Sequence, residues 1–128
     1  MDTNRAYISM GSNIDSHANF SMAIKLLREY CEVLAISSYR TTKPIGITEQ
    51  PDFLNGVVYI STSFDMDAVA RHLKSIEDTM GRDRTLPKYG PRNIDLDVVI
   101  WNDDVVDNDY HTRVFIRDAV EEINGVKG

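Results

Sequence analysis

The sequence predicts an α+β fold in which an antiparallel sheet carries two helices on one face. Three observations support it: strand-like and helix-like segments follow the order β-α-β-β-α-β, both helical segments are apolar on one side, and no segment repeats. This order is the ferredoxin-like, split βαβ plan. With 128 residues, 42% of them apolar, the chain can bury one hydrophobic core. We therefore expect residues 1–128 to form a single domain.

The first half of the chain supplies a strand, a helix and a second strand. Residues 6–10 form a short apolar strand that stops at Gly11-Ser12-Asn13, which we interpret as a turn and the start of a helix. Apolar residues then recur at helical spacing: Phe20, Ala23, Ile24, Leu27 and Tyr30. Residues 33–39 form the second strand. A loop over residues 41–52 follows, punctuated by prolines and a glycine, and loops of such length usually carry function.

The second half supplies a strand, a helix and a final strand. Residues 53–62 read as the third strand, and residues 67–80 as a helix that ends at Gly81. One side of that helix is apolar, formed by Val69, Leu73, Ile76 and Met80. Residues 94–101 form the fourth strand. No strand or helix is assigned beyond residue 101.

Composition and charge exclude several classes of protein. The formal net charge of −6 argues against general binding to nucleic acid or to anionic membranes. The first residues are polar and no apolar stretch approaches the length of a membrane span, so we expect a cytoplasmic protein. Cys31 is the only cysteine, which excludes an internal disulfide and a CxxC motif. Its position on the apolar side of the first helix predicts a role in core packing.

A local excess of positive charge lies between the second helix and the fourth strand. Residues 82–92 contain Arg82, Arg84, Lys88 and Arg92 against the single carboxylate of Asp83. Enzymes that move phosphoryl groups need such cations to offset phosphate charge, together with carboxylates that hold Mg²⁺. The segment is thus a candidate polyphosphate site. The alternative is that the arginines only complement the dipole at the end of a helix.

The carboxylates of that candidate site lie in the fourth strand. Because side chains alternate along a strand, Asp95 and Asp97 point to one face, whereas Ile94, Leu96 and Val98 point to the other. The two aspartate Cα atoms should lie about 7 Å apart, close enough for both carboxylates to bind Mg²⁺. The alternative is a solvated strand face.

The third strand combines an aromatic ring and an amide on one face. Phe53, Asn55 and Val57 share that face, and Leu54, Val58 and Ile60 share the other. A ring that stacks beside an amide that reads donors and acceptors suits a flat heterocycle. The backbone of the preceding Pro44-Ile45-Gly46 could contact the same ligand. The alternatives are a core role for Phe53 and a local backbone partner for Asn55.

These residues lie in four ordered blocks that resemble the 6-hydroxymethyl-7,8-dihydropterin pyrophosphokinase family. The resemblance runs from residue 7 to about residue 106. The blocks are Tyr7-Ile8-Ser9-Met10-Gly11-Ser12-Asn13, Ser38-Tyr39-Arg40-Thr41-Thr42-Lys43-Pro44-Ile45-Gly46, Gln50-Pro51-Asp52-Phe53-Leu54-Asn55, and Gly81-Arg82-Asp83-Arg84 with Tyr89-Gly90-Pro91-Arg92-Asn93-Ile94-Asp95-Leu96-Asp97. The last block, G-R-x-R followed by G-P-R-x-x-D-x-D, is highly specific.

The resemblance implies an ATP-dependent transferase of folate biosynthesis. Such an enzyme moves the β,γ-pyrophosphoryl group of ATP to the hydroxymethyl group of the dihydropterin, giving AMP and the pyrophosphate ester. Two Mg²⁺ ions are expected, with Asp95 and Asp97 as their ligands, while Arg82 and Arg92 steady the transferring group. The implied ATP contacts are Glu77, Arg84, Lys88, Tyr89 and His111. The implied pterin contacts are Thr42, Pro44, Ile45, Gly46, Phe53, Asn55 and Phe115.

The C-terminal region departs from the family pattern and reads as an abridged extension. Arg113 and Phe115 retain an Arg-x-Phe, which would place Phe115 opposite Phe53 in an aromatic sandwich around the pterin. No proline precedes His111, and Asp118-Ala119 replaces a Pro-Leu. A paralogue that binds ATP or a pterin with little or no turnover is therefore the alternative function. We expect a monomer that binds neither nucleic acid nor membrane.

Overall fold

The computed structural model describes residues 3–44, 46–81 and 93–127, without the side chains of residues 126 and 127. In these ranges the chain forms a six-stranded sheet in which every pair of neighbours is antiparallel. The strands are β1 (Asn4–Ser12), β2 (Glu32–Ile36), β3 (Arg40–Thr42), β4 (Phe53–Thr62), β5 (Asp95–Trp101) and β6 (Asp104–Val105). Their order is β2-β4-β1-β5-β6, and β3 also pairs with β4. The long strand β1 is therefore central, between β4 and β5.

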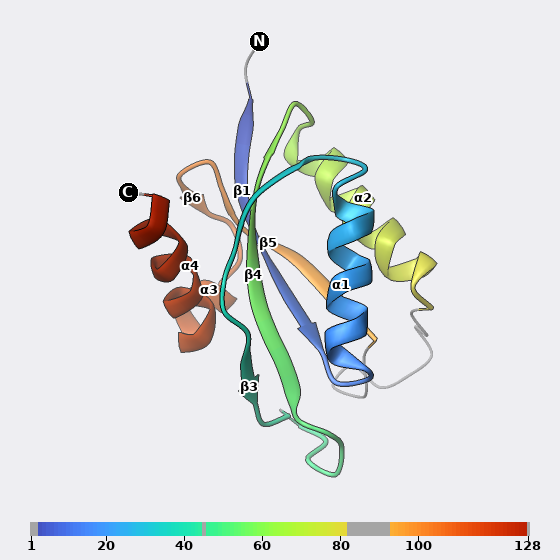
Figure 1. Ribbon diagram of the computed structural model, residues 1–128. Coiled ribbons are helices and arrows are strands. Elements are labelled where there is room, and N and C mark those ends of the chain that lie inside the picture. Colours follow the sequence, from blue (N-terminus) through green and yellow to red (C-terminus); the bar gives the residue numbers. More distant parts are fainter. Residues whose placement is uncertain (1–2, 45, 82–92, 128) are drawn as a thin grey trace.

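Helices pack on both faces of this sheet (Figure 1). The two predicted helices, α1 (Ser16–Leu27) and α2 (Met66–Thr79), lie together on one face, as expected. The helices α3 (Asp109–Thr112) and α4 (Val114–Lys127) were not predicted, and α4 packs on the opposite face. The C-terminal region thus supplies a second helical layer, on the face of the sheet opposite α1 and α2.

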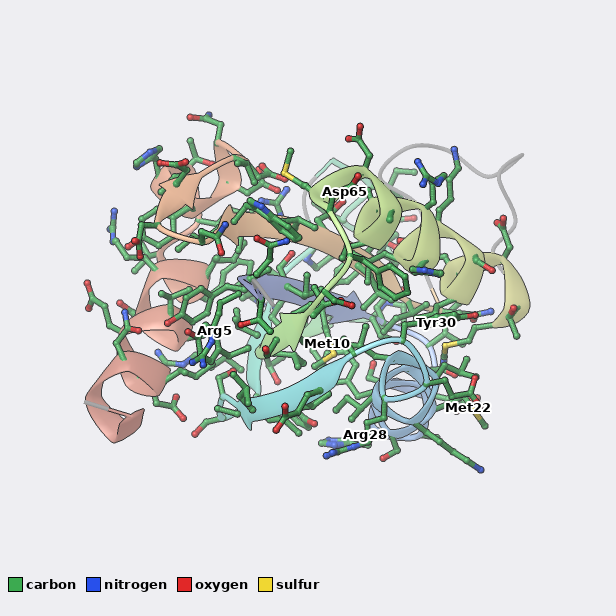
Figure 2. All side chains as sticks on the ribbon, turned by 90° about the horizontal axis from the view of Figure 1, so that it is seen from above. Arg5, Met10, Met22, Arg28, Tyr30 and Asp65 are labelled. Atoms are coloured by element: carbon green, nitrogen blue, oxygen red, sulfur yellow. The ribbon has the colours of Figure 1, made fainter. Side chains whose placement is uncertain are left out.

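Two separate cores result from the alternation of side chains along the strands. Met10 belongs to the core beneath α1 and α2, whereas Tyr7 on the same strand belongs to the core beneath α4. Figure 2 shows Arg5 on the side of α4 and Tyr30 on the side of α1 and α2. The core beneath α4 is smaller and contains Tyr7, Val57, Tyr59, Val99, Ile100, Ile116, Ala119, Val120 and Ile123.

The predicted boundaries hold best where local chemistry defines the ends of an element. Strand β4 has the predicted bounds. Helix α2 begins one residue before the predicted start, because the Asp65 carboxylate accepts a hydrogen bond from the backbone N–H of Ala68 at 2.8 Å. It ends before Gly81, whose φ of 87° is a left-handed conformation that favours glycine.

The second predicted strand, residues 33–39, ends earlier than expected. Strand β2 stops at Ile36 because the Ser37 hydroxyl, instead of a backbone carbonyl, accepts the hydrogen bond of the Val57 N–H at 2.9 Å. The chain then returns to β4 as β3, which occupies the first residues of the predicted loop. The loop between the two strands therefore begins after Thr42, and Arg40 and Thr42 become sheet residues.

Cys31 lies beyond the end of α1 at Leu27, so its predicted place on that helix is wrong. It nevertheless packs against the core beneath α1 and α2, which confirms its predicted role in packing. Its thiol donates a hydrogen bond to the carbonyl of Leu27 at 3.3 Å. Burial raises the pKa of the Cys31 thiol to about 11, because the thiolate loses hydration there. Within the described ranges, no helix is both long enough and apolar enough to cross a membrane.

Candidate active site

Asp95 and Asp97 lie on the same face of β5, as the alternation predicted. Their neighbours Ile94 and Leu96 are buried in the core beneath α1 and α2. Both aspartates therefore point to the opposite face of the sheet, the face on which α4 packs. Asp97 is exposed and Asp95 half-buried. The two aspartates are not part of the core beneath α4. Their carboxylates are thus on a face that a ligand can approach.

Gly11 lies between the aspartates of β5 and the amide of β4. It pairs with Asp95 on one side and with Asn55 on the other, so these three residues form one row across the sheet. A Cβ atom at Gly11 would lie 3.6 Å from Asn55 Oδ1 and 4.0 Å from Phe53 Cδ1. The space above Gly11 is therefore bordered by an amide oxygen and an aromatic edge, and we call it the Gly11 gap; Asp95 is the strand partner of Gly11 on the opposite side.

Asn55 has its nitrogen engaged and its oxygen directed toward that gap. The Nδ2 group donates to Thr42 Oγ1 at 2.7 Å and to the carbonyls of Arg40 and Phe53, each at 3.3 Å. Asn55 is buried, so these bonds fix the amide orientation. The alternative that Asn55 bonds to nearby backbone is therefore confirmed for its side-chain nitrogen, which donates to the carbonyls of Arg40 and Phe53. The structure also brings Thr42 and Asn55 together, two residues that the resemblance assigns to the pterin.

Asn13 holds the loop that precedes β4, a role that the sequence did not predict. Its buried side chain donates to Gln50 Oε1 at 2.8 Å and to the carbonyl of Pro51 at 3.1 Å. These contacts span the turn after β1 and the residues just before Phe53. They fix where β4 begins beside the gap at Gly11. Only a pairing between residues far apart in sequence could have revealed this function.

Glu77 supports the strand that carries the aspartates. Its side chain is buried on α2, and Oε2 accepts a hydrogen bond from the backbone N–H of Leu96 at 2.9 Å. Leu96 lies between Asp95 and Asp97, so Glu77 holds the backbone from which both carboxylates project. A charge-assisted bond of this kind is stronger than a neutral one.

A groove of about 370 Å³ runs between α2 and the β5–β6 region. Its polar lining includes Lys74, Glu77 and Asp97, and its apolar lining includes Met66, Leu73, Leu96, Val98 and Val106. Such a size and mixed lining suit a small organic ligand. Asp97 therefore belongs both to the aspartate pair and to the lining of the groove.

Several predicted site residues are not joined to this arrangement by the structure. Arg82, Arg84, Lys88, Tyr89, Arg92 and Ile45 lie outside the described residues. His111 is exposed on α3, in edge contact with Tyr110, and is not part of the groove lining. Phe115 packs against the core beneath α4. The ring contacts among described residues do not include a Phe53–Phe115 pair, so the aromatic sandwich stays a prediction.

The aspartate pair fits Mg²⁺ as a ligand set. Mg²⁺ binds through one or two carboxylates and completes its octahedron with substrate phosphates and water. Asp95 and Asp97 supply two such carboxylates two residues apart on one strand face. Across the ranges that the structure describes, no group of three or more His, Cys, Asp and Glu side chains is placed to hold a metal. Two carboxylates would leave most positions of a Mg²⁺ octahedron to other oxygen ligands.

A carboxylate pair, an amide, an aromatic edge and a groove of ligand size define a candidate enzyme site for a small, partly polar molecule. Comparison with known proteins defines the family. Residues 7–125 match the model of the 7,8-dihydro-6-hydroxymethylpterin-pyrophosphokinase family, and the chain belongs to this family.

Similar proteins include both single enzymes and parts of longer chains. The chain is 34% identical over 121 residues to a 2-amino-4-hydroxy-6-hydroxymethyldihydropteridine pyrophosphokinase of Bacillus subtilis, covering 89% of this chain and 72% of that protein. It is 30% identical over 129 residues to the Haemophilus influenzae protein of the same name, covering 92% and 80%. It is 41% identical over 110 residues to the folic acid synthesis protein fol1 of Schizosaccharomyces pombe, covering 84% of this chain but only 15% of that protein.

Proposed function

We propose that this chain transfers the pyrophosphoryl group of ATP to 6-hydroxymethyl-7,8-dihydropterin, giving AMP and the pyrophosphate ester, a step of folate biosynthesis. The row Asp95–Gly11–Asn55 is the observation that carries the proposal. In this row Gly11, which has no side chain, lies between a carboxylate that would bind metal and an amide that would bind the heterocycle. Family membership over residues 7–125 supports it.

On the phosphate side, Asp95 and Asp97 would hold two Mg²⁺ ions, and Asp95 would also lie near the hydroxyl that attacks. Bound Mg²⁺ would supply neutralisation of the phosphate charge. Glu77 keeps both aspartates in register through Leu96 N–H. Arg82 and Arg92 would steady the transferring group, so that the chain contributes positioning and electrostatic stabilisation and no covalent intermediate.

On the pterin side, the Asn55 amide oxygen and the Phe53 edge border the space above Gly11. Asn55 Nδ2 donates its hydrogen bond to Thr42 Oγ1, and this bond orients the amide. The Asn55 Oδ1 atom can then accept a hydrogen bond from a donor group of the heterocycle. Phe53 would stack on one face of the ring and Phe115, from the start of α4, would approach the other. The backbone of Pro44, Ile45 and Gly46 would complete the pocket.

The groove between α2 and β5 is the proposed place of the nucleotide. It meets the metal-binding face at Asp97, and its apolar lining suits the adenosine part of ATP. Arg84, Lys88, Tyr89 and His111 are proposed as further ATP contacts. The net charge of −6 supports a protein that does not bind nucleic acid in general. We further propose a ferredoxin-like arrangement, one domain, and action as a cytoplasmic monomer.

A protein that binds ATP or a pterin with little turnover is the second candidate. It is favoured by the position of His111, which lies apart from the groove, and by the replaced Pro-Leu at Asp118-Ala119. Against it, α4 runs without interruption through Asp118 and Ala119, so the fold accommodates the replacement.

A direct assay separates the two candidates. Purified protein is incubated with ATP, Mg²⁺ and 6-hydroxymethyl-7,8-dihydropterin, and AMP and the pterin product are quantified by chromatography and mass spectrometry. We expect equal amounts of AMP and pterin pyrophosphate. If calorimetry shows binding of ATP or pterin but no AMP forms, the transferase proposal is wrong and the binding protein is correct.

A further inference from the structure

Two acidic residues of α4, Asp118 and Glu122, are tied to the segment that leads into β3. The Glu122 carboxylate accepts hydrogen bonds from the backbone N–H of Ser38 at 2.8 Å and from the Ser38 hydroxyl at 2.9 Å. Arg40 forms an ion pair with Asp118 at 3.4 Å and approaches Glu122 at 4.0 Å. Four contacts between three residue pairs thereby join segments that are about 80 positions apart in sequence. We refer to Ser38, Arg40, Asp118 and Glu122 as the α4 clamp.

The α4 clamp lies next to the residues proposed to read the pterin. Arg40 is the strand partner of Asn55, and the Arg40 carbonyl accepts a hydrogen bond from Asn55 Nδ2. Two residues further along β3, Thr42 Oγ1 accepts the shorter bond from the same nitrogen. Because β3 has only three residues and pairs only with the end of β4 in the described part of the sheet, its placement needs support from outside the sheet.

We infer that Glu122, with Arg40 and Asp118, is a positioning residue for pterin recognition. Through Ser38 and β3, Glu122 holds the Arg40 carbonyl and Thr42 hydroxyl that orient the Asn55 amide. This inference rests on the proposed function, since it assigns the pterin side of that site. It also assigns a function to the altered C-terminal region, because Asp118 is the first residue of the Asp118-Ala119 pair that replaces Pro-Leu.

The contacts of the α4 clamp differ in strength. The Arg40 and Asp118 side chains are 45% and 39% exposed, so their ion pair contributes little on its own. Glu122 makes two charge-assisted hydrogen bonds, one of them to a backbone N–H that fixes the chain itself. Glu122 should therefore matter more to the placement of β3 than either partner in the ion pair.

The experiment compares Glu122→Ala with Glu121→Ala. Glu121 is the adjacent carboxylate of α4, is exposed, and has no ion pair within the described part of the chain, so it controls for charge and for helix propensity. We expect Glu122→Ala to raise KM and Kd for the pterin about 5- to 10-fold, as loss of one or two charge-assisted bonds allows, while kcat and the KM for ATP change less than twofold. Glu122→Gln, which keeps an acceptor oxygen, should lie between.

A readout that needs neither ligand nor turnover separates this inference from the proposed function. Hydrogen exchange of the ligand-free protein should become several-fold faster at residues 38–42 in Glu122→Ala and stay unchanged in Glu121→Ala. Ser38→Ala, which removes one donor without touching α4, should give a smaller increase at the same residues. Equal exchange and equal pterin affinity in the two glutamate variants would overturn the inference. Absence of AMP in the parent protein would instead overturn the transferase proposal.

Discussion

Replacement of Gly11 by alanine separates pterin binding from folding. The added Cβ would meet Asn55 Oδ1 at 3.6 Å and Phe53 Cδ1 at 4.0 Å, which are ordinary van der Waals distances. The backbone at Gly11 is not in the left-handed region, so alanine is compatible with it. We therefore expect the free energy of unfolding to stay unchanged or to rise by about 0.5 to 1 kcal/mol, the usual gain when a strand glycine becomes alanine.

The same methyl group would fill the gap that we assign to the heterocycle. One excess methyl in a fitted pocket costs about 1 to 3 kcal/mol of binding, or roughly a 10- to 200-fold loss of affinity. The effect should fall on the pterin, because Gly11 borders Asn55 and Phe53 and is not part of the groove beside α2. The affinity for ATP should therefore stay within about twofold of the parent value, the margin of an unaffected site.

Gly56→Ala is the matched control. Its Cβ would lie 2.9 Å from Tyr39 Cδ1, so it should destabilise the fold by about 1 to 3 kcal/mol through overpacking. Pterin affinity by fluorescence titration and stability by urea denaturation are measured for both variants. The reasoning predicts lost affinity with retained stability for Gly11→Ala and the reverse for Gly56→Ala. Unchanged pterin affinity in Gly11→Ala would refute the assignment of the gap.

Three further predictions concern the strand with the aspartates and the core. Glu77→Ala leaves the buried Leu96 N–H without its acceptor and should lower the free energy of unfolding by about 1 to 3 kcal/mol in urea denaturation. Asp97→Ala should reduce turnover by orders of magnitude with only a modest loss of pterin affinity, because the metal acts mainly on the transition state. Burial raises the pKa of Cys31 from 9.0 to about 11, so the unfolded chain loses that proton first as pH rises. The free energy of unfolding should then fall between pH 9 and 11, more steeply than in Cys31→Ala.

Each of these predictions has an outcome that contradicts it. Equal stability of Glu77→Ala and Glu77→Gln would mean that the hydrogen bond to Leu96 contributes nothing. Normal turnover by Asp97→Ala would place the metals elsewhere. Parallel stability curves for the parent and Cys31→Ala above pH 9 would show that the thiol titrates alike in both states.

The sequence predicted the elements whose ends are set by local residues. Strand β4 and helix α2 agree with prediction within one residue, because Asp65 and Gly81 mark the helix ends by capping and backbone conformation. The shared face of Asp95 and Asp97 also followed from alternation alone. Helix α4 was missed, although Ile116, Ala119, Val120 and Ile123 recur at helical spacing, because that region was interpreted through its family pattern.

The supporting contacts of the candidate site could not be predicted from local pattern. The Glu77 bond to Leu96, the Asn13 bonds to Gln50 and Pro51, and the Glu122 bonds to Ser38 each join segments far apart in the chain. Residue type and spacing do not predict which distant residues form these hydrogen bonds. The break at Ser37 likewise depends on a side-chain bond to Val57 in another strand.

The central claim is that Asp95 and Asp97 together hold divalent metal for a bound nucleotide. Binding of Mn²⁺, a paramagnetic substitute for Mg²⁺, can be counted by electron paramagnetic resonance in the presence of a non-hydrolysable ATP analogue and the pterin. The parent protein should bind two Mn²⁺ ions per chain under conditions where the Asp95→Asn, Asp97→Asn double variant binds none beyond those of the free nucleotide. Equal Mn²⁺ binding by the two proteins would contradict the account.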